Sequence, residues 1–188
     1  MRSLVRHAGL LAALVLGLGC ATSNQVPLTY QPVALEAPMC VSSFAVVKFA
    51  DDRGKTQIGQ NMDEELFYPQ GDVTGWMSQA LRRQLETVGC RVEYHEREYP
   101  FDTDAVISGQ LLEAYTSQSS MTNYVTTMRF RVVMKKQGRE VFVKSYEGKF
   151  ANTVLVSSRG NRTKLLESAL QDMMRQVLPD LIQQAKTD

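Results

Sequence analysis

The sequence contains few histidines and few cysteines. Its 188 residues include two histidines, three cysteines and one tryptophan. Zinc sites are built from clusters of histidine, cysteine and carboxylate ligands, and many nucleophilic hydrolases place a histidine beside the nucleophile. After residue 20 the chain offers only one histidine, His95, in a charged run after a short strand pattern. This scarcity argues against a zinc enzyme and against a Ser-His-Asp hydrolase.

The chain also lacks an excess of charge of either sign. It carries 21 basic and 20 acidic residues, which give a formal net charge of +1. A nucleic-acid-binding domain normally has a basic excess, so the composition argues against a nucleic-acid partner. Hydrophobic residues make up 44% of the chain, which is enough for a core, and the length fits one ordinary domain with additional segments.

Two motifs invite a chemical interpretation. The segment 54–59 has two glycines at the spacing of a phosphate-binding loop, but its Lys-Thr pair lies between the glycines instead of after them. Asp51 and Asp52 end a strand pattern and could form a catalytic or cation-binding pair, whereas the adjacent Arg53 favours a salt-bridged turn. We therefore expect a non-enzymatic protein with no catalytic residue, no metal and no cofactor.

The N-terminus has the composition of a secretion signal. Arg2 and Arg6 precede an apolar run over residues 8–18, which has the length of a signal-peptide core and is too short to span a bilayer. Gly19 and Cys20 follow, and they resemble the bacterial lipobox, in which the cysteine is lipidated and becomes the first mature residue. The alternative is an ordinary cleaved signal with a chance cysteine.

The lipobox resemblance implies a location and a division of the chain. Ala21 follows the cysteine where an aspartate would imply retention at the inner membrane, so the resemblance implies the periplasmic face of the outer membrane, with acyl chains such as palmitate as the anchor. We expect a signal peptide over residues 1–19, a lipidated Cys20 with an extended tether over residues 20–38, and one periplasmic domain over residues 39–188. Prolines and the lack of a helical period predict the tether.

The expected domain has strand patterns and two helical patterns. The strand patterns lie at residues 43–50, 90–94, 104–115, 128–135 and 141–150. Apolar residues at helical spacing predict one helix over residues 73–88, capped by Asp72, and a second from Asn161 onward, which Pro179 should bend or break. The order β-α-β-β-β-β-α predicts an α+β fold, with one mixed sheet and both amphipathic helices packed on one face.

Two cysteines remain once Cys20 is assigned to lipid. Cys40 and Cys90 each precede a strand, and one helix joins the two strands, which makes the strands parallel. If the strands are neighbours, both cysteines lie at the same end of the sheet. An even pair in an exported chain favours a disulfide, and two buried free thiols are the alternative.

A second candidate feature is an apolar segment in a polar loop. Leu66, Phe67 and Tyr68 stand before Pro69 between two otherwise polar stretches. Either they fold back onto the core, or they form an apolar tip that contacts a protein partner. We keep both alternatives and name these residues as a candidate partner contact.

Taken together, these features resemble the YajG-type lipoproteins of Gram-negative bacteria. The similarity spans most of the mature chain and is carried by the lipobox, Leu28-Thr29-Tyr30-Gln31-Pro32, Asp51-Asp52-Arg53, Ile58-Gly59 and Val88-Gly89-Cys90. The resemblance implies a small envelope lipoprotein and brings no catalytic residue. We expect an interaction or assembly module of the cell envelope with a protein partner; the alternative is an accessory lipoprotein of an envelope lipid-transport complex.

Overall fold

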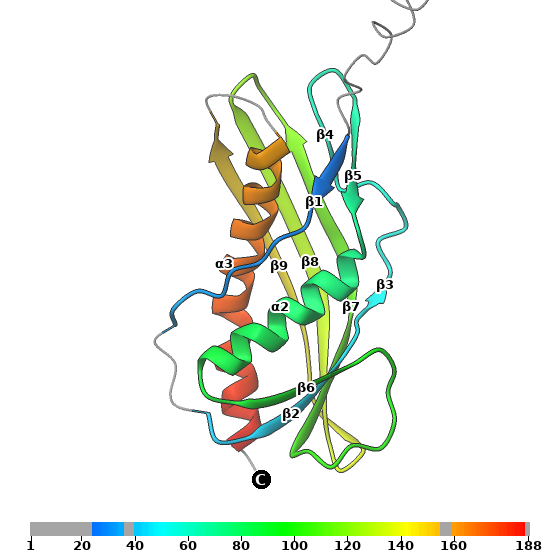
Figure 1. The fold of residues 1–188 in the computed structure, drawn as a ribbon, viewed down its shortest axis with the longest axis vertical. Coiled ribbons are helices and arrows are strands. Elements are labelled where there is room, and N and C mark those ends of the chain that lie inside the picture. Colours follow the sequence, from blue (N-terminus) through cyan, green and yellow to red (C-terminus); the bar gives the residue numbers. More distant parts are fainter. Residues whose placement is uncertain (1–23, 36–39, 155–158, 187–188) are drawn as a thin grey trace, which may run out of the picture.

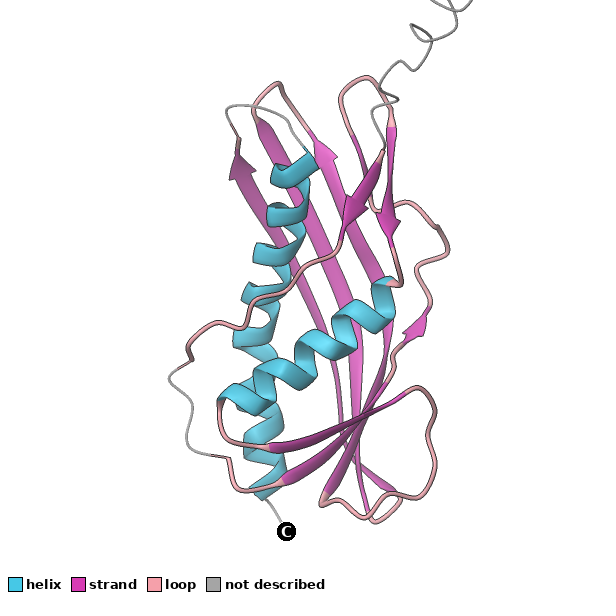
Figure 2. Ribbon diagram, viewed as in Figure 1, coloured by secondary structure: helices cyan, strands magenta, loops and turns pink. Residues whose placement is uncertain are grey.

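The computed structural model describes residues 24–35, 40–154 and 159–186. In these residues nine strands form a mixed sheet, and two helices lie on one of its faces (Figures 1 and 2). The strands are β1 (Gln25–Pro27), β2 (Ser43–Val47), β3 (Ala50–Asp51), β4 (Gly59–Gln60), β5 (Leu66–Gln70), β6 (Arg91–His95), β7 (Ala105–Gln118), β8 (Asn123–Lys136) and β9 (Arg139–Thr153). The helices are α2 (Val73–Thr87) and α3 (Arg159–Lys186). The predicted α+β class is confirmed.

The long strands β7, β8 and β9 form an antiparallel meander that carries most of the sheet. Every second residue of β8 faces the helices and is buried, as period-two alternation predicts. These residues are Tyr124, Thr126, Met128, Phe130, Val132 and Met134. Gln137 and Gly138 both have positive φ at the β8–β9 turn, which suits a tight hairpin. Among the described strands β9 pairs with β8 alone, so it is an edge of the sheet.

A β-α-β unit occupies the other part of the sheet. β2 and β6 pair in parallel and α2 connects them through the intervening chain, while β2 also pairs in parallel with β7. Asp72 caps α2 by accepting a hydrogen bond from the Thr74 N–H (N···O 3.1 Å). The helix ends before Gly89, whose φ of 90° is the left-handed conformation typical of a helix C-terminus. Both helix boundaries thus follow from the sequence.

The second helix differs from the prediction at Pro179. α3 is continuous from Arg159 to Lys186 with the proline inside it, and it begins before Asn161, the expected cap. Leu178 and Leu181, on either side of the proline, are both fully buried. Their packing against the sheet offsets the loss of one backbone hydrogen bond, so the proline does not divide the helix.

The molecule has two distinct ends (Figure 1). β4 pairs with the end of β7, so the β4–β5 turn (residues 61–65) and the β7–β8 turn (residues 119–122) emerge together; we call this the turn end. β2 begins beside the start of β7, so residues 40–43 lie at the opposite end with the β8–β9 turn; we call this the disulfide end. At about 3.3 Å per residue, β7 separates the two ends by roughly 40 Å.

Candidate functional site

Residues 24–35 lie against the folded domain; we call them the N-terminal segment (Figure 1). β1 pairs in parallel with β5, so Gln25 is opposite Tyr68. The Tyr68 N–H donates to the Asn24 carbonyl (N···O 2.9 Å), and Val26 is only 1% exposed. The N-terminal segment is therefore part of the domain.

The prediction of a tether over residues 20–38 is thus wrong for residues 24–35. Its backbone is extended, as the prolines and the missing helical period predict. It is not free, because the buried side chains of Val26 and Tyr30 complete the core. The folded domain accordingly begins before Met39. Residues 20–23 and 36–38 of the expected tether lie outside the described residues.

A buried glutamine of α2 holds the N-terminal segment in place. The Gln84 Oε1 accepts hydrogen bonds from the Tyr30 hydroxyl (2.6 Å) and from the Val33 N–H (3.0 Å), and its Nε2 donates to the Val33 carbonyl (2.7 Å). One side-chain amide therefore pairs with both backbone groups of Val33, as a neighbouring strand would. Burial raises the pKa of the Tyr30 phenol, which keeps that hydroxyl a neutral donor.

Both helices contribute further contacts to this segment. The Glu167 carboxylate of α3 accepts from the Thr29 hydroxyl (2.9 Å) and from the Gln31 N–H (2.6 Å). The Trp76 indole N–H of α2 donates to the Thr29 carbonyl (2.8 Å), and Gln171 Nε2 of α3 donates to the Gln31 carbonyl (2.8 Å). The N-terminal segment thus connects α2 to α3 through hydrogen bonds that satisfy its backbone.

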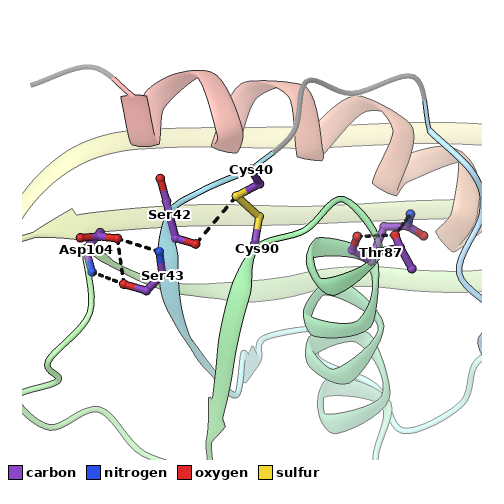
Figure 3. The surroundings of a disulfide bond; sticks show 7 residues. Cys40, Ser42, Ser43, Thr87, Cys90 and Asp104 are labelled. Atoms are coloured by element: carbon purple, nitrogen blue, oxygen red, sulfur yellow. Dashed lines mark hydrogen bonds between the residues drawn. A yellow bond between two sulfur atoms is a disulfide. The ribbon is translucent and has the colours of Figure 1, made fainter.

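Cys40 and Cys90 are joined by a disulfide at the disulfide end (Figure 3). Their Cα atoms are 4.8 Å apart, across a sequence separation of 50 residues. The pairing of Ser43 with Arg91 brings the starts of β2 and β6 together, which is the geometry that the β-α-β argument predicts. Nearby, the Asp104 carboxylate accepts from the Ser43 N–H (2.7 Å) and hydroxyl (2.8 Å); these hydrogen bonds, the backbone one foremost, lower the pKa of Asp104.

The candidate partner contact at residues 66–68 divides between core and surface. Phe67 is 1% exposed, and the Arg162 guanidinium lies over its ring at 3.7 Å from the centroid. Leu66 is half-buried, and only Tyr68 is exposed. The hypothesis of an exposed apolar tip therefore does not hold for Phe67, because its ring is buried in the core.

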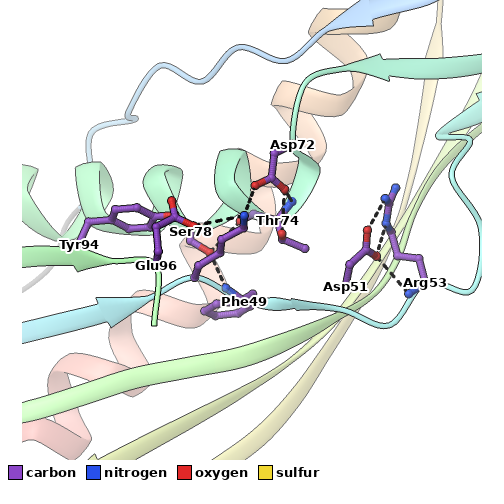
Figure 4. Close-up of polar contacts among 9 residues, drawn as sticks. Phe49, Asp51, Arg53, Asp72, Thr74, Ser78, Tyr94 and Glu96 are labelled. Carbon is purple, nitrogen blue, oxygen red and sulfur yellow. Dashed lines mark hydrogen bonds and ion pairs between the residues drawn. The ribbon is translucent and has the colours of Figure 1, made fainter. Parts of the chain in front are cut away.

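The two aspartates after β2 have separate partners. Arg53 Nε and Nη2 donate to the two Asp51 carboxylate oxygens, both at 2.7 Å (Figure 4). The hydrogen bond from the Arg53 side chain lowers the pKa of Asp51. Asp52 instead accepts from Gln110 Nε2 (2.8 Å). This is the salt-bridged turn that Arg53 favours, and it leaves Asp51 without the raised pKa that suits a general acid.

Lys48, directly after β2, forms ion pairs with two carboxylates, those of Asp72 and Glu96, which are labelled in Figure 4. Its Nζ lies 2.5 Å from an Asp72 carboxylate oxygen and 3.3 Å from a Glu96 carboxylate oxygen. Burial pushes the pKa of Asp72 upward, but hydrogen bonds from Lys48, Thr74 and the backbone outweigh burial and lower it. The hydrogen bond to Asp72 raises the pKa of Lys48. Lys48 and Asp72 therefore stay charged at neutral pH, and the ion pairs of Lys48 join the end of β2 to the start of α2 and to the residue after β6.

The disulfide end also contains a groove that the sequence did not predict. Residues 98–103, Val106, Lys135 and the β8–β9 turn surround about 860 Å³. The groove is bounded by an ion pair between Lys135 Nζ and the Glu98 carboxylate (2.7 Å). We call it the aromatic groove, because Tyr99 and Phe101 are among the residues that line it.

The aromatic residues of this groove are packed against one another. The Tyr99 hydroxyl is hydrogen-bonded to His95 Nδ1 (2.7 Å), and the ring centroids of Tyr99 and Phe101 are 4.1 Å apart. The His95 ring centroid lies 4.5 Å from that of Phe101. Tyr99 nevertheless stays 52% exposed. The signal in the sequence was the pair of aromatics around Pro100 inside a charged run.

Other kinds of site are not found in the described part of the chain. In residues 24–35, 40–154 and 159–186, no group of three or more histidine, cysteine, aspartate or glutamate residues could hold a metal ion. None of the helices described has the length and apolarity that crossing a membrane requires. Cys20, the predicted lipidation site, lies outside the described residues.

Comparison with known proteins identifies the fold. No family model and no curated protein matches the sequence. Protein XCC0632 from Xanthomonas campestris, assigned to the family model DUF330, is 12% identical, with 86% of this chain and 96% of that chain covered and a TM-score of 0.66. The fold is shared with bacterial proteins. The hypothetical protein CT253 from Chlamydia trachomatis is 11% identical, with 78% and 99% covered and a TM-score of 0.51.

Lipoproteins are also among the similar structures. The uncharacterized lipoprotein B from Nitrosomonas europaea is 11% identical, with 82% of this chain and 91% of that chain covered and a TM-score of 0.44. At these identities the similarities to XCC0632 and CT253 establish the fold alone. The specific resemblance to YajG-type lipoproteins stays a prediction.

Proposed function

We propose that this protein is a non-enzymatic envelope lipoprotein that binds a protein partner through the aromatic groove. Acyl chains on Cys20 hold it at the periplasmic face of the outer membrane. The observation that carries the proposal is the groove itself, with Tyr99 52% exposed beside Phe101. Exposed aromatic rings with a polar rim are typical of protein-binding surfaces.

The disulfide supports the envelope location. Disulfides persist in oxidising compartments such as the periplasm and are rare in the cytosol. Cys40 and Cys90 are joined, and Cys20 is the third cysteine of the chain, directly after an apolar run of signal-peptide length. The signal and the disulfide therefore point to the same compartment.

The side-chain chemistry supports binding over catalysis. Asp51, Lys48 and Asp72 are engaged in ion pairs that hold their charges at neutral pH. His95 is packed against Tyr99 and Phe101, and its Nδ1 is occupied by the Tyr99 hydroxyl. The residues that line the aromatic groove include no serine, cysteine or histidine, and Lys135 and Glu98 are paired with each other, so the groove offers contact surface more readily than an activated nucleophile.

Site-specific photo-crosslinking in cells tests this function. A photoreactive amino acid replaces Tyr99, and the control places it at Met62, which is equally exposed at 53% but lies at the turn end. We expect a protein adduct at position 99 and none of the same mass at position 62. The same adduct at both positions, or none at position 99, contradicts a partner in the groove. An adduct with lipid at position 99 favours the accessory subunit of a lipid-transport complex.

A further inference from the structure

The N-terminal segment leaves little chain between the proposed anchor and the domain. Asn24 already contributes a hydrogen bond to β5, and only residues 21–23 separate it from Cys20. A fully extended chain covers at most about 3.6 Å per residue, so Asn24 lies within roughly 14 Å of Cys20. A free tether from residue 20 to residue 38 would have reached several times further.

The point of attachment lies at the turn end. β1 and β5 run in the same direction, with Gln25 opposite Tyr68, and β5 begins where the β4–β5 turn ends. The chain therefore enters the domain beside the β4–β5 turn (Figure 1). The β7–β8 turn emerges at the same end, because Gln60 of β4 pairs with Ser117 of β7.

Each of the two turns exposes a methionine. Met62 in the β4–β5 turn is 53% exposed, and Met121 in the β7–β8 turn is 82% exposed. Methionine has a flexible apolar side chain that adapts to irregular apolar surroundings. Neither side chain is part of the hydrophobic core, because both turns extend beyond it. The two apolar groups thus stand at the end of the molecule that the short link holds near the lipid.

We infer that the turn end rests on the bilayer that holds Cys20, with Met62 and Met121 in the interfacial layer. This inference rests on the proposed lipid anchor. The long strands then lead away from the membrane, and the aromatic groove faces the periplasm roughly 40 Å from the turn end. The bilayer is the occupant that the geometry favours, since the link of three residues leaves it within reach of both turns.

The charges of the β4–β5 turn specify the headgroups. Asp63, Glu64 and Glu65 are all exposed beside Met62. Carboxylates are repelled by anionic lipids, whereas the ammonium group of a zwitterionic headgroup can face them. The inferred contact is therefore with a zwitterionic bilayer such as one of phosphatidylethanolamine, and added anionic lipid weakens it.

Fluorescence quenching by lipid tests the orientation. Full-length lipidated protein is reconstituted into phosphatidylethanolamine vesicles that contain phosphatidylcholine brominated in the upper acyl chain, and flotation with the vesicles measures anchoring. Met121→Trp and Val41→Trp form a matched pair, since the native side chains are 82% and 77% exposed at opposite ends. The unsubstituted protein supplies the baseline from Trp76.

We expect all three proteins to float, with quenching and a blue shift of the added fluorescence in Met121→Trp and neither in Val41→Trp. Flotation with equal quenching of both variants, or with stronger quenching of Val41→Trp, overturns the orientation and leaves the anchor standing. A protein that fails to float overturns the anchor and the orientation together. Met62→Trp and Tyr99→Trp, at sites 53% and 52% exposed, repeat the comparison independently should one variant of the first pair misfold.

Discussion

Gln84 shows how one polar residue can define a chain path in an apolar region. It sits on the buried face of α2, where an amide without partners would destabilise the fold. Three of its four side-chain hydrogen bonds go to Tyr30 and Val33, and the fourth goes to Thr87 Oγ1 on the same helix, so most of its polar partners are present only when the N-terminal segment is in place. The cost of an unpaired buried amide therefore selects the docked conformation.

Replacing this amide should loosen the N-terminal segment. Gln84→Ala removes the three hydrogen bonds to the N-terminal segment and the one to Thr87, and it leaves the Tyr30 hydroxyl buried without that partner. We expect a loss of about 3 kcal/mol in the free energy of unfolding, at roughly 1 kcal/mol for each hydrogen bond to the N-terminal segment. Urea unfolding followed by circular dichroism measures it. Gln79→Ala, half-buried on the same helix, should change stability by less than about 0.5 kcal/mol, and an equal loss there contradicts the assignment.

At the level of residues, sequence patterning finds burial better than it finds polar partners. Leu81 and Leu85 follow from helical periodicity, and both are buried. Gln84 lies between them in the sequence and gives no sign of a role, because its partners are some 50 residues away. Phe67 leaves two interpretations open for the same reason, since the ring of a loop residue can pack inward or outward until the sheet is known.

Among the elements, α3 and β9 are joined by a charged contact at one edge of the sheet. Asp180 of α3 accepts hydrogen bonds from Lys144 Nζ and from the Tyr146 hydroxyl of β9, both at 2.6 Å. Burial raises the pKa of Asp180, but these two hydrogen bonds outweigh burial and lower it. Burial and the hydrogen bond to Asp180 also raise the pKa of Tyr146.

This contact should make stability depend on acidity. Because the pKa of Asp180 is lower in the folded state, its contribution is present above the unfolded pKa of about 3.9 and is lost as the pH falls through the folded value. We expect the free energy of unfolding to fall below about pH 4, and Asp180→Asn to show a weaker fall in urea titrations at several pH values. Asp63→Asn, at an exposed residue of the β4–β5 turn, should retain the full pH dependence, and an unchanged profile in Asp180→Asn contradicts the role.

The disulfide between the starts of β2 and β6 gives a second prediction at this scale. A bridge across 50 residues contributes about 4 kcal/mol in the chain-entropy model, so the double variant Cys40→Ala/Cys90→Ala should lose about that much stability. Urea unfolding of the mature protein measures the loss. Reduction of the unsubstituted protein should reproduce it. Two titratable thiols in the native, oxidised protein would instead show that the bridge is absent.

The elements themselves follow from sequence to different degrees. The helix at residues 73–88 and the long strands of the meander have clear periodicity and strong stop signals, and they appear within a few residues of their expected limits. β3 and β4 have two residues each and depend on pairing with β7, so local sequence does not predict either of them as a separate strand. Pro179 misleads because the packing of its neighbours decides whether the helix continues.

For the whole molecule, Cys20 determines where the domain is held. Cys20→Ser should abolish acylation and leave an uncleaved precursor, because a hydroxyl cannot replace the thiol that is lipidated before cleavage. Mass spectrometry of the purified protein and fractionation of cell membranes measure both effects. Ala21→Ser, one residue later, should mature normally. A Cys20→Ser protein that is processed and stays in the outer-membrane fraction contradicts the anchor.

At this scale the sequence predicts the division of the chain only in part. Composition separates an apolar N-terminus from the remainder and identifies extended backbone after it. It does not reveal that residues 24–35 complete the core, because their partners lie on α2, α3 and β5. The aromatic groove is missed likewise, since it forms only where residues 98–103 meet the hairpin of β8 and β9.

The free side of β9 affects how copies of the protein meet one another. An edge strand of 15 residues is a template on which an identical strand could add and start an aggregate. Charged side chains recur along it, at Arg139, Glu140, Lys144, Glu147 and Lys149. In addition, Gln184 Nε2 donates to the Val141 carbonyl (3.3 Å). A second strand that paired with β9 would have to bury these charges. Copies of the protein that are concentrated on one membrane can therefore collide along the β9 edge without polymerising.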